Sequence, residues 1–203
     1  MTPGALPDPI AVALLVDRQL EKLGVRYVVG GSFASSLHGE LRSTNDIDVV
    51  ADLDPTTARL FVDALGQDFY ADASAAIAAA QSGGSFNVVH IETALKVDVF
   101  VAAGDPFDRM RLQRRQRVVV DSQDSNAVLY VDTAEDVVLR KLEWYRRGGE
   151  TSERQWRDVL AVLRVQQHLD DGYLRSWAGR LGISDLLERA QTDVRSGPRD
   201  AGR

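Results

Sequence analysis

Hydrophobic and polar positions alternate with two different periods along this chain of 203 residues. Apolar residues at helical spacing, bounded by Gly, Pro or Asp, predict helices at about 8–22, 33–38, 54–65, 72–81, 133–147, from about 151 to beyond 163, 173–180 and 184–190. Short apolar runs predict strands at 25–29, 45–50, 85–91, 95–101, 118–120 and 127–131. Strands and helices therefore mix in the first part of the chain, and only helices follow.

The pattern changes near Thr133, which divides the chain. Residues 8–132 are expected to form an α/β (α+β) core, with a mixed sheet flanked by helices. Residues 133–191 are expected to form a C-terminal helical region, with Thr133 as the N-cap of its first helix. The last residues, 192–203, are expected to be a disordered tail.

A glycine-rich turn joins the strand at 25–29 to the following helix. Its residues are Gly30, Gly31 and Ser32. Free backbone N–H groups and the positive end of the helix dipole meet at such a turn, where phosphate is the natural ligand. The alternative is that the two glycines only allow a tight turn.

Two acidic residues follow on the next predicted strand. Residues two apart in a strand face the same side, so Asp46 and Asp48 should project together while Ile47 and Val49 enter the core. Neighbouring carboxylates repel each other, and a hard divalent cation with oxygen ligands relieves that repulsion. The alternative is a pair of solvent-facing residues on an edge strand.

The Gly-Gly-Ser turn followed by Asp-x-Asp resembles the nucleotidyltransferase superfamily that shares its fold with DNA polymerase β. The matching positions are Gly30, Gly31, Ser32, Asp46 and Asp48, and Arg42 and Thr44 fit the Arg-x-Thr-x-Asp-x-Asp form of small bacterial members. The resemblance implies a polymerase β-like fold. It also implies a bound nucleoside triphosphate such as ATP, and Mg²⁺ or Mn²⁺ on the carboxylates.

A third carboxylate is expected on the strand at 95–101. Asp98 lies on the opposite face from Val97 and Val99, and it matches the superfamily's apolar-Asp-apolar pattern. A site for two metal ions needs about three carboxylates. The alternative is a polar residue on the solvated face of a hairpin, next to Lys96.

The helical region from Ala134 to Leu163 resembles small bacterial nucleotidyltransferases that include the AbiEii-type toxins. In that group a lysine and a downstream aspartate complete the site, and Lys141 and Asp158 match them. The resemblance implies that Lys141 binds the triphosphate and that Asp158 orients this lysine or binds the acceptor. The alternatives are an exposed Lys141, and an Asp158 that pairs with Arg154 one helical turn away.

Charge limits the choice of partner. The net charge of −6 and the pI near 5.1 argue against a protein dominated by nonspecific binding to nucleic acids. Five arginines at 109–117 are either a solvated face or a phosphate-contacting patch. Cysteine is absent, which excludes disulfides and thiolate metal sites. No stretch is long enough to cross a membrane, so a cytoplasmic protein without a membrane partner is expected.

Together, these features predict an enzyme that moves a nucleoside monophosphate from a triphosphate to an acceptor hydroxyl. The acceptor is left open by the residues. A tRNA or a protein is expected if the chain acts as a toxin with a cognate antitoxin. The alternatives are an aminoglycoside or lincosamide antibiotic, or a non-catalytic nucleotide-binding relic of the fold. The antibiotic enzymes carry Gly-Gly-Trp-Ala where this chain has Gly-Gly-Ser-Phe-Ala.

Overall fold

The computed structural model describes residues 8–40, 46–102 and 104–196. These residues form two compact units. The first comprises 8–33, 46–102 and 104–133, and the second comprises 34–40 and 134–196. The division after Thr133 lies where the hydrophobic pattern changes. The second unit also takes in most of the short helix α2 (Gly31–His38).

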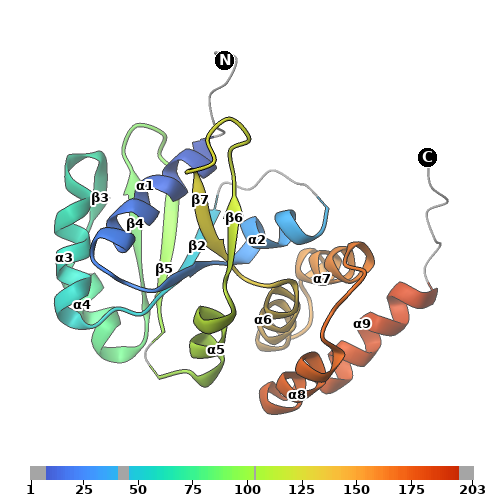
Figure 1. Cartoon of the computed structure of the whole chain (residues 1–203). Coiled ribbons are helices and arrows are strands. Elements are labelled where there is room, and N and C mark those ends of the chain that lie inside the picture. The colour runs from blue at the N-terminus through green and yellow to red at the C-terminus, as the bar shows by residue number, and fades with distance from the viewer. Residues whose placement is uncertain (1–7, 41–45, 103, 197–203) are drawn as a thin grey trace. The chain divides into compact units, whose positions relative to one another are not determined.

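A mixed sheet is the centre of the first unit (Figure 1). Among the described residues it has seven strands: β1 (Tyr27–Val29), β2 (Asp46–Ala51), β3 (Phe69–Ala71), β4 (Ser85–His90), β5 (Lys96–Val101), β6 (Gln116–Val119) and β7 (Val128–Val131). Their order across the sheet is β3-β4-β5-β2-β1-β7-β6. The pairs β2–β5 and β1–β7 are parallel, and the other neighbouring strands are antiparallel. This arrangement confirms the predicted mixed sheet flanked by helices.

Helices pack on both faces of this sheet. The helices of the first unit are α1 (Asp8–Lys22), α3 (Pro55–Leu65), α4 (Ala73–Ser82) and α5 (Pro106–Arg114). The main core joins α1, α3 and α4 to one face of the sheet, and Phe61, Ile47 and Val49 are among its buried residues. On the opposite face, Leu112 of α5 packs with Val28. Because residues alternate along β2, Asp46 and Asp48 lie on the face away from the main core.

Local sequence signals set several boundaries as predicted. Asp54 caps α3, accepting a hydrogen bond from the Thr57 N–H at 2.7 Å, while the Thr57 hydroxyl accepts from the Asp54 N–H at 2.9 Å. Pro55 occupies the first turn of this helix, where its missing N–H costs nothing. Asp72 caps α4 in a similar way. These contacts are made within a few residues, so the sequence alone can specify them.

Three features of the first unit differ from the expectation. Strand β3 was not predicted, because it has only three residues and depends on pairing with β4. Helix α5 was not predicted, and Asp105 caps it by accepting hydrogen bonds from the Phe107 and Asp108 N–H groups. Strand β1 begins at Tyr27 rather than Val25, because the Val25 N–H donates to the Leu20 carbonyl and closes the end of α1.

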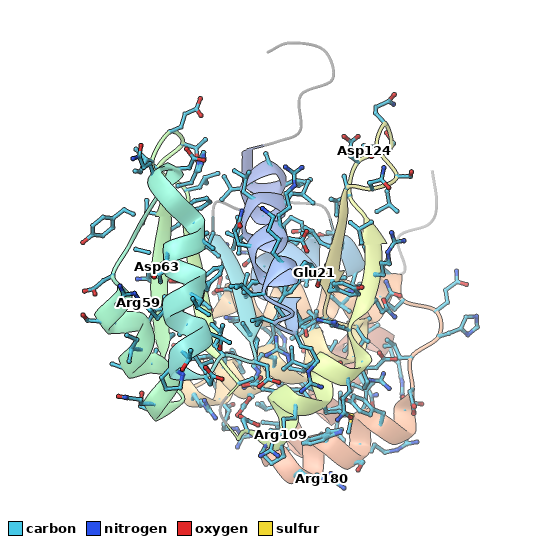
Figure 2. All side chains as sticks on the ribbon, turned by 60° about the vertical axis from the view of Figure 1, so that its left-hand side comes forward. Glu21, Arg59, Asp63, Arg109, Asp124 and Arg180 are labelled. Atoms are coloured by element: carbon cyan, nitrogen blue, oxygen red, sulfur yellow. The ribbon has the colours of Figure 1, made fainter. Side chains whose placement is uncertain are left out.

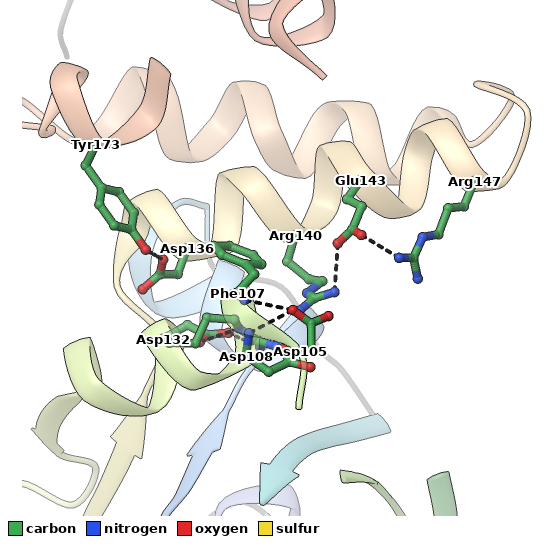
Figure 3. Close-up of polar contacts among 10 residues, drawn as sticks. Asp105, Phe107, Asp108, Asp132, Asp136, Arg140, Glu143, Arg147 and Tyr173 are labelled. Carbon is green, nitrogen blue, oxygen red and sulfur yellow. Dashed lines mark hydrogen bonds and ion pairs between the residues drawn. The ribbon is translucent and has the colours of Figure 1, made fainter. Parts of the chain in front are cut away.

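The second unit is helical. It contains α6 (Ala134–Arg147), α7 (Glu153–Val165), α8 (Asp171–Leu181) and α9 (Ser184–Ser196), together with residues 34–40. The Gln166 side chain donates to the His38 carbonyl at 2.7 Å and ties the short segment to the end of α7. Inside the unit, the Tyr173 hydroxyl donates to the buried Asp136 at 2.5 Å, and Arg140 and Arg147 both pair with Glu143 (Figure 3).

The expected disordered tail begins too early. Residues 192–196 belong to α9, because this helix packs on α7 and Asp193 accepts a hydrogen bond from the Trp156 indole at 3.2 Å. Trp156 is 37 positions away from Asp193 in the sequence, so no local signal predicts that the helix continues to Ser196. The rest of the predicted tail, 197–203, lies outside the described residues.

The helices carry charged outer faces. On α3, Arg59 donates to Asp63 one turn later, and both side chains are more than half exposed (Figure 2). Such a pair adds a few tenths of a kcal/mol, roughly 0.3–0.5, to an isolated helix. Among the described helices, none has the length and apolar character needed to cross a membrane.

Candidate active site

The carboxylates of β2 and β5 meet in register. These strands are parallel, and Asp48 lies directly beside Asp98 across the pair. Asp46 is exposed near the start of β2, whereas Asp48 and Asp98 are half-buried. The predicted orientation of all three is confirmed, because Ile47 on the other face is fully buried. Two neighbouring strands therefore bring three acidic side chains to one face of the sheet.

A lysine also lies in this cluster. Lys96 is beside Asp46 in the strand register, and its ammonium is 2.7 Å from Asp98 Oδ2. The hydrogen bond to Asp98 raises the pKa of Lys96, burial opposes this slightly, and the charges of Asp98, Asp46 and Asp48 add to the increase. All three carboxylates therefore favour the charged form of Lys96. Sequence reasoning noted Lys96 only as a neighbour of Asp98, although the period of two already places both on one face.

The glycine turn closes directly on Asp48. The Gly30 N–H donates to the Asp48 carbonyl at 2.9 Å. Gly31 has a φ of +56°, and a Cβ atom added there would lie 1.7 Å from Asp48 Oδ2. Gly31 is therefore required both for its backbone conformation and for the space next to the carboxylate. This contact places the start of α2 beside the carboxylate cluster.

A buried ion pair supports the other side of the turn. A Cβ atom added at Gly30 would lie 2.7 Å from both Arg111 Nη2 and Asp132 Oδ2. Arg111 donates to Asp132 through Nε at 3.0 Å and Nη2 at 2.6 Å, and through Nη1 to Asp108 at 2.7 Å. Burial disfavours the charged guanidinium, but the two carboxylates outweigh this and raise the pKa of Arg111. The turn thus lies between an ion pair and Asp48.

The arginines at 109–117 do not form one exposed patch. Arg111 is only 3% exposed. Arg115 donates to the Tyr27 carbonyl at 2.8 Å and lies 4.1 Å from the centre of the Tyr130 ring. Arg109, labelled in Figure 2, donates to the Gly104 carbonyl at 2.8 Å. Both alternatives, a solvated face and a phosphate-contacting patch, are therefore wrong for Arg111, which is buried and pairs with Asp132.

Two of the predicted binding residues, Arg42 and Thr44, lie outside the described residues. Ser32 is described and half-buried in the first turn of α2, next to Gly31. Its predicted contact with a phosphate stays a prediction. Two further residues at the turn, Arg111 and Asp132, were not predicted as parts of the site. They are 21 positions apart and meet only in the folded chain.

Lys141 and Asp158 pair within the second unit. The Lys141 ammonium donates to Asp158 Oδ2 at 2.8 Å and to the Gln155 side chain at 3.3 Å. Lys141 is buried, so it is not an exposed surface lysine. Asp158 contacts Lys141 of the neighbouring helix, which agrees with the orienting role that the resemblance implies. The roles of both residues toward a substrate stay predictions.

The donor set of the first unit fits a hard divalent cation. Asp46, Asp48 and Asp98 offer only carboxylate oxygens, the ligands that Mg²⁺ and Mn²⁺ prefer. The Lys96 ammonium on Asp98 shows that this face accepts positive charge. Within the described part of the chain, no group of three or more His, Asp or Glu side chains is already arranged as a metal cage. A metal would therefore bind with movement of side chains.

Comparison with solved structures identifies the fold. The chain is similar to an antigenic nucleotidyltransferase-like protein from Paracoccidioides brasiliensis, with 17% identity, a TM-score of 0.57, and coverage of 90% of this chain and 91% of that chain. The antibiotic-resistance factor ANT(2'')-Ia has 10% identity, a TM-score of 0.45, and coverage of 93% and 92%. The Thermotoga maritima CCA-adding enzyme complexed with tRNA has 13% identity, a TM-score of 0.41, and coverage of 95% and 52%.

Of these three likenesses, only the first exceeds a TM-score of 0.5. No family model and no curated protein matches the sequence. At 17% identity the first likeness establishes the architecture. It agrees with the mixed sheet flanked by helices. The chain therefore has the nucleotidyltransferase fold.

Proposed function

We propose that the chain transfers a nucleoside monophosphate from a nucleoside triphosphate to an acceptor hydroxyl. The observation that carries this proposal is the contact between the glycine turn and Asp48, which lies in register with Asp98. A phosphate-binding turn and a cation-binding carboxylate pair are thereby adjacent. Either feature alone occurs in many folds, but this reaction needs both at one place.

The residues of the first unit divide the work. The N–H groups of Gly31 and Ser32 at the start of α2, with the Ser32 hydroxyl, bind the β and γ phosphates. Asp46, Asp48 and Asp98 hold Mg²⁺ or Mn²⁺, which supplies positive charge against the triphosphate. Gly30 lets the backbone pass close to the Arg111–Asp132 ion pair, which keeps the turn in place. Most of the rate enhancement then comes from positioning and charge neutralisation.

Asp98 is proposed as the proton acceptor. The acceptor hydroxyl gives its proton to the Asp98 carboxylate, and its oxygen forms a bond to the α-phosphorus. The bond from that phosphorus to the bridging oxygen of the β phosphate breaks, and pyrophosphate leaves with the electron pair. The Asp98 carboxylate is partly exposed to solvent, so the acceptor hydroxyl can reach it. As the resemblance implies, Lys141 is proposed to bind the triphosphate. Asp158 is proposed to orient Lys141.

The resemblance to AbiEii-type toxins favours tRNA as the acceptor and a cognate antitoxin as a partner. Arg111 and Arg115 make hydrogen bonds within the first unit. The arginines at 109–117 therefore no longer support tRNA as a patch that contacts its phosphates. The experiment therefore offers the enzyme three acceptor classes in parallel: total tRNA, a protein extract and an aminoglycoside. Each reaction contains one α-labelled triphosphate with Mg²⁺ or Mn²⁺. We expect label in tRNA.

Asp48→Asn is the decisive variant, and Asp52→Asn is its matched control. Asp52 follows β2 directly but pairs with Arg26 at the surface, so the same chemical change there should leave transfer intact. A second measurement needs no acceptor: Mn²⁺ with a nonhydrolysable triphosphate should raise the melting temperature of the wild type and Asp52→Asn, but not of Asp48→Asn. Equal transfer or an equal thermal shift in Asp48→Asn would overturn the proposed site.

A further inference from the structure

The position of Lys96 is set by the same strand pairing that assembles the carboxylates. It lies two residues before Asp98 on β5, so the two side chains leave the same face of the strand. In the parallel register its neighbour on β2 is Asp46. The geometry thus places one cation beside three carboxylates, on a segment too regular to move without breaking the sheet.

The Lys96 ammonium reduces the repulsion within this carboxylate cluster. Asp48 and Asp98 are direct neighbours across the strand pair, and like charges in that position are destabilising. The Lys96 ammonium, 2.7 Å from Asp98 Oδ2, neutralises part of this charge. It thereby does in the metal-free protein what a divalent cation would do in the loaded protein.

The same contact lies in the way of a metal ion. An oxygen that accepts a charge-assisted hydrogen bond from an ammonium must give up that bond before it can coordinate a metal with the same electron pair. The Lys96 side chain is 43% exposed and that of Asp98 is 19% exposed, so the ammonium can leave into solvent while the carboxylate stays. A lysine is suited to this exchange, because its charge sits at the end of a flexible stem of four carbons.

We propose that Lys96 is an internal counter-cation that competes with the divalent metal for Asp98. This inference rests on the proposed function, in which Asp46, Asp48 and Asp98 bind that metal. Lys96 stabilises the three carboxylates when no metal is bound, and it lowers their affinity for the divalent metal ion. Metal then fills the site only when its concentration is high enough to displace the ammonium.

Titration with Mn²⁺ alone tests the proposal, with free Mn²⁺ measured by electron paramagnetic resonance. Lys96→Met removes the competing charge and should tighten Mn²⁺ binding about threefold to tenfold, as expected for a partly exposed ion pair. Lys96→Arg keeps a cation at the same place and should bind Mn²⁺ like the wild type. Lys22→Met is the matched control, because it removes one positive charge from the surface of α1, where the ammonium donates to the Gln19 side chain at 3.5 Å.

A structural role for Lys96 gives a different result. An ion pair that only stabilises the sheet would change the melting temperature and leave the Mn²⁺ affinity as it is. If the wild type binds Mn²⁺ and Lys96→Met binds it equally or more weakly, then Lys96 does not compete with the metal for Asp98. The proposed function would be unaffected by that result. Absence of Mn²⁺ binding in all four proteins would refute the metal site itself, and the competition with it.

Thermal unfolding gives an independent readout. In the presence of a chelator, Lys96→Met should melt at a lower temperature than Lys22→Met, because it removes the ammonium that lies 2.7 Å from Asp98 Oδ2. With saturating Mn²⁺ the difference between the two melting temperatures should vanish or change sign, since the metal then supplies the positive charge. An identical metal-induced shift in the two variants would contradict the proposal.

Discussion

Arg111 donates to Asp132 Oδ2 at 2.6 Å, and both atoms lie where a side chain at residue 30 would have to go. Arg111 is 3% exposed and Asp132 is 1% exposed, so the pair is removed from water. The Asp132 N–H donates to the Val29 carbonyl at 3.0 Å, immediately before the turn. The pair therefore fixes the backbone at the end of β1, from which the glycine turn departs.

Breaking this pair should be costly. In Asp132→Ala the buried guanidinium loses two hydrogen bonds and one carboxylate partner, and breaking a buried ion pair typically costs about 3–5 kcal/mol. We expect a loss of that order in the free energy of unfolding, measured by urea denaturation. Asp52→Ala is the matched control, because its partner Arg26 is 56% exposed and such pairs contribute about 1 kcal/mol or less. Equal losses in the two variants would show that burial does not govern the Arg111 pair.

Gly31→Ala should destabilise the chain more than an equivalent change at Gly24. Both glycines have positive φ, +56° and +66°, and the left-handed region costs an alanine roughly 1–2 kcal/mol. A Cβ at Gly24 would meet nothing within 4 Å, whereas at Gly31 it would collide with the Asp48 carboxylate. Overpacking adds about 1–3 kcal/mol, so the difference between the two variants measures the contact with Asp48. Urea denaturation of Gly24→Ala and Gly31→Ala in parallel gives this difference, and equal values would contradict the close approach.

The residues that sequence reasoning found are those whose signal is local. The cap of α3 needs only Asp54 and the three residues after it, and the facing of Asp46 and Asp48 follows from the period of a strand. The alternation also placed Asp98 on the polar side of its strand. What it could not give is that β5 pairs with β2 in parallel, which sets Asp98 beside Asp48. Strand order is a tertiary property, and many orders fit one pattern.

The residues that sequence reasoning misjudged depend on distant partners. Arg111 resembles its exposed neighbours in the sequence, and only the fold brings Asp132 to it from 21 positions away. The end of α9 is similar, since Asp193 is held by Trp156, 37 positions earlier. A charged run therefore cannot be assigned to solvent or to the interior from composition alone.

Lys141→Met should reduce stability as well as any binding of triphosphate. Its ammonium is buried and bonded to Asp158 and Gln155, so removal breaks an ion pair with a carboxylate that is 11% exposed. We expect a loss of about 3 kcal/mol, near the lower end for a broken buried pair. The double variant Lys141→Met/Asp158→Leu should lose less than Lys141→Met alone, because it also removes the carboxylate that lost the Lys141 ammonium. Urea denaturation measures both, and strictly additive losses would show that the two residues are not coupled.

Asp17 should make the stability of the chain depend on pH. Burial raises the pKa of Asp17 in the folded protein, and the hydrogen bond that it accepts from the Tyr27 hydroxyl opposes this only in part. The unfolded value is about 3.9, so above that pH the folded state binds more protons than the unfolded state. The contribution of Asp17 to stability is therefore complete at or below about pH 3.9 and is lost as the pH rises through the folded pKa.

Asp17→Asn removes this titration, so the test follows the difference between two proteins. The free energy of unfolding of the wild type minus that of Asp17→Asn should fall as the pH rises from about 4, and it should level off once Asp17 is ionised in the folded state. Urea denaturation at several pH values up to 7 gives the difference. Asp63→Asn is the control for loss of one negative charge, because Asp63 lies on the exposed face of α3 and pairs there with the exposed Arg59. A difference that rises with pH would mean that Asp17 is stabilised as a carboxylate, and that its hydrogen bond with Tyr27 outweighs its burial.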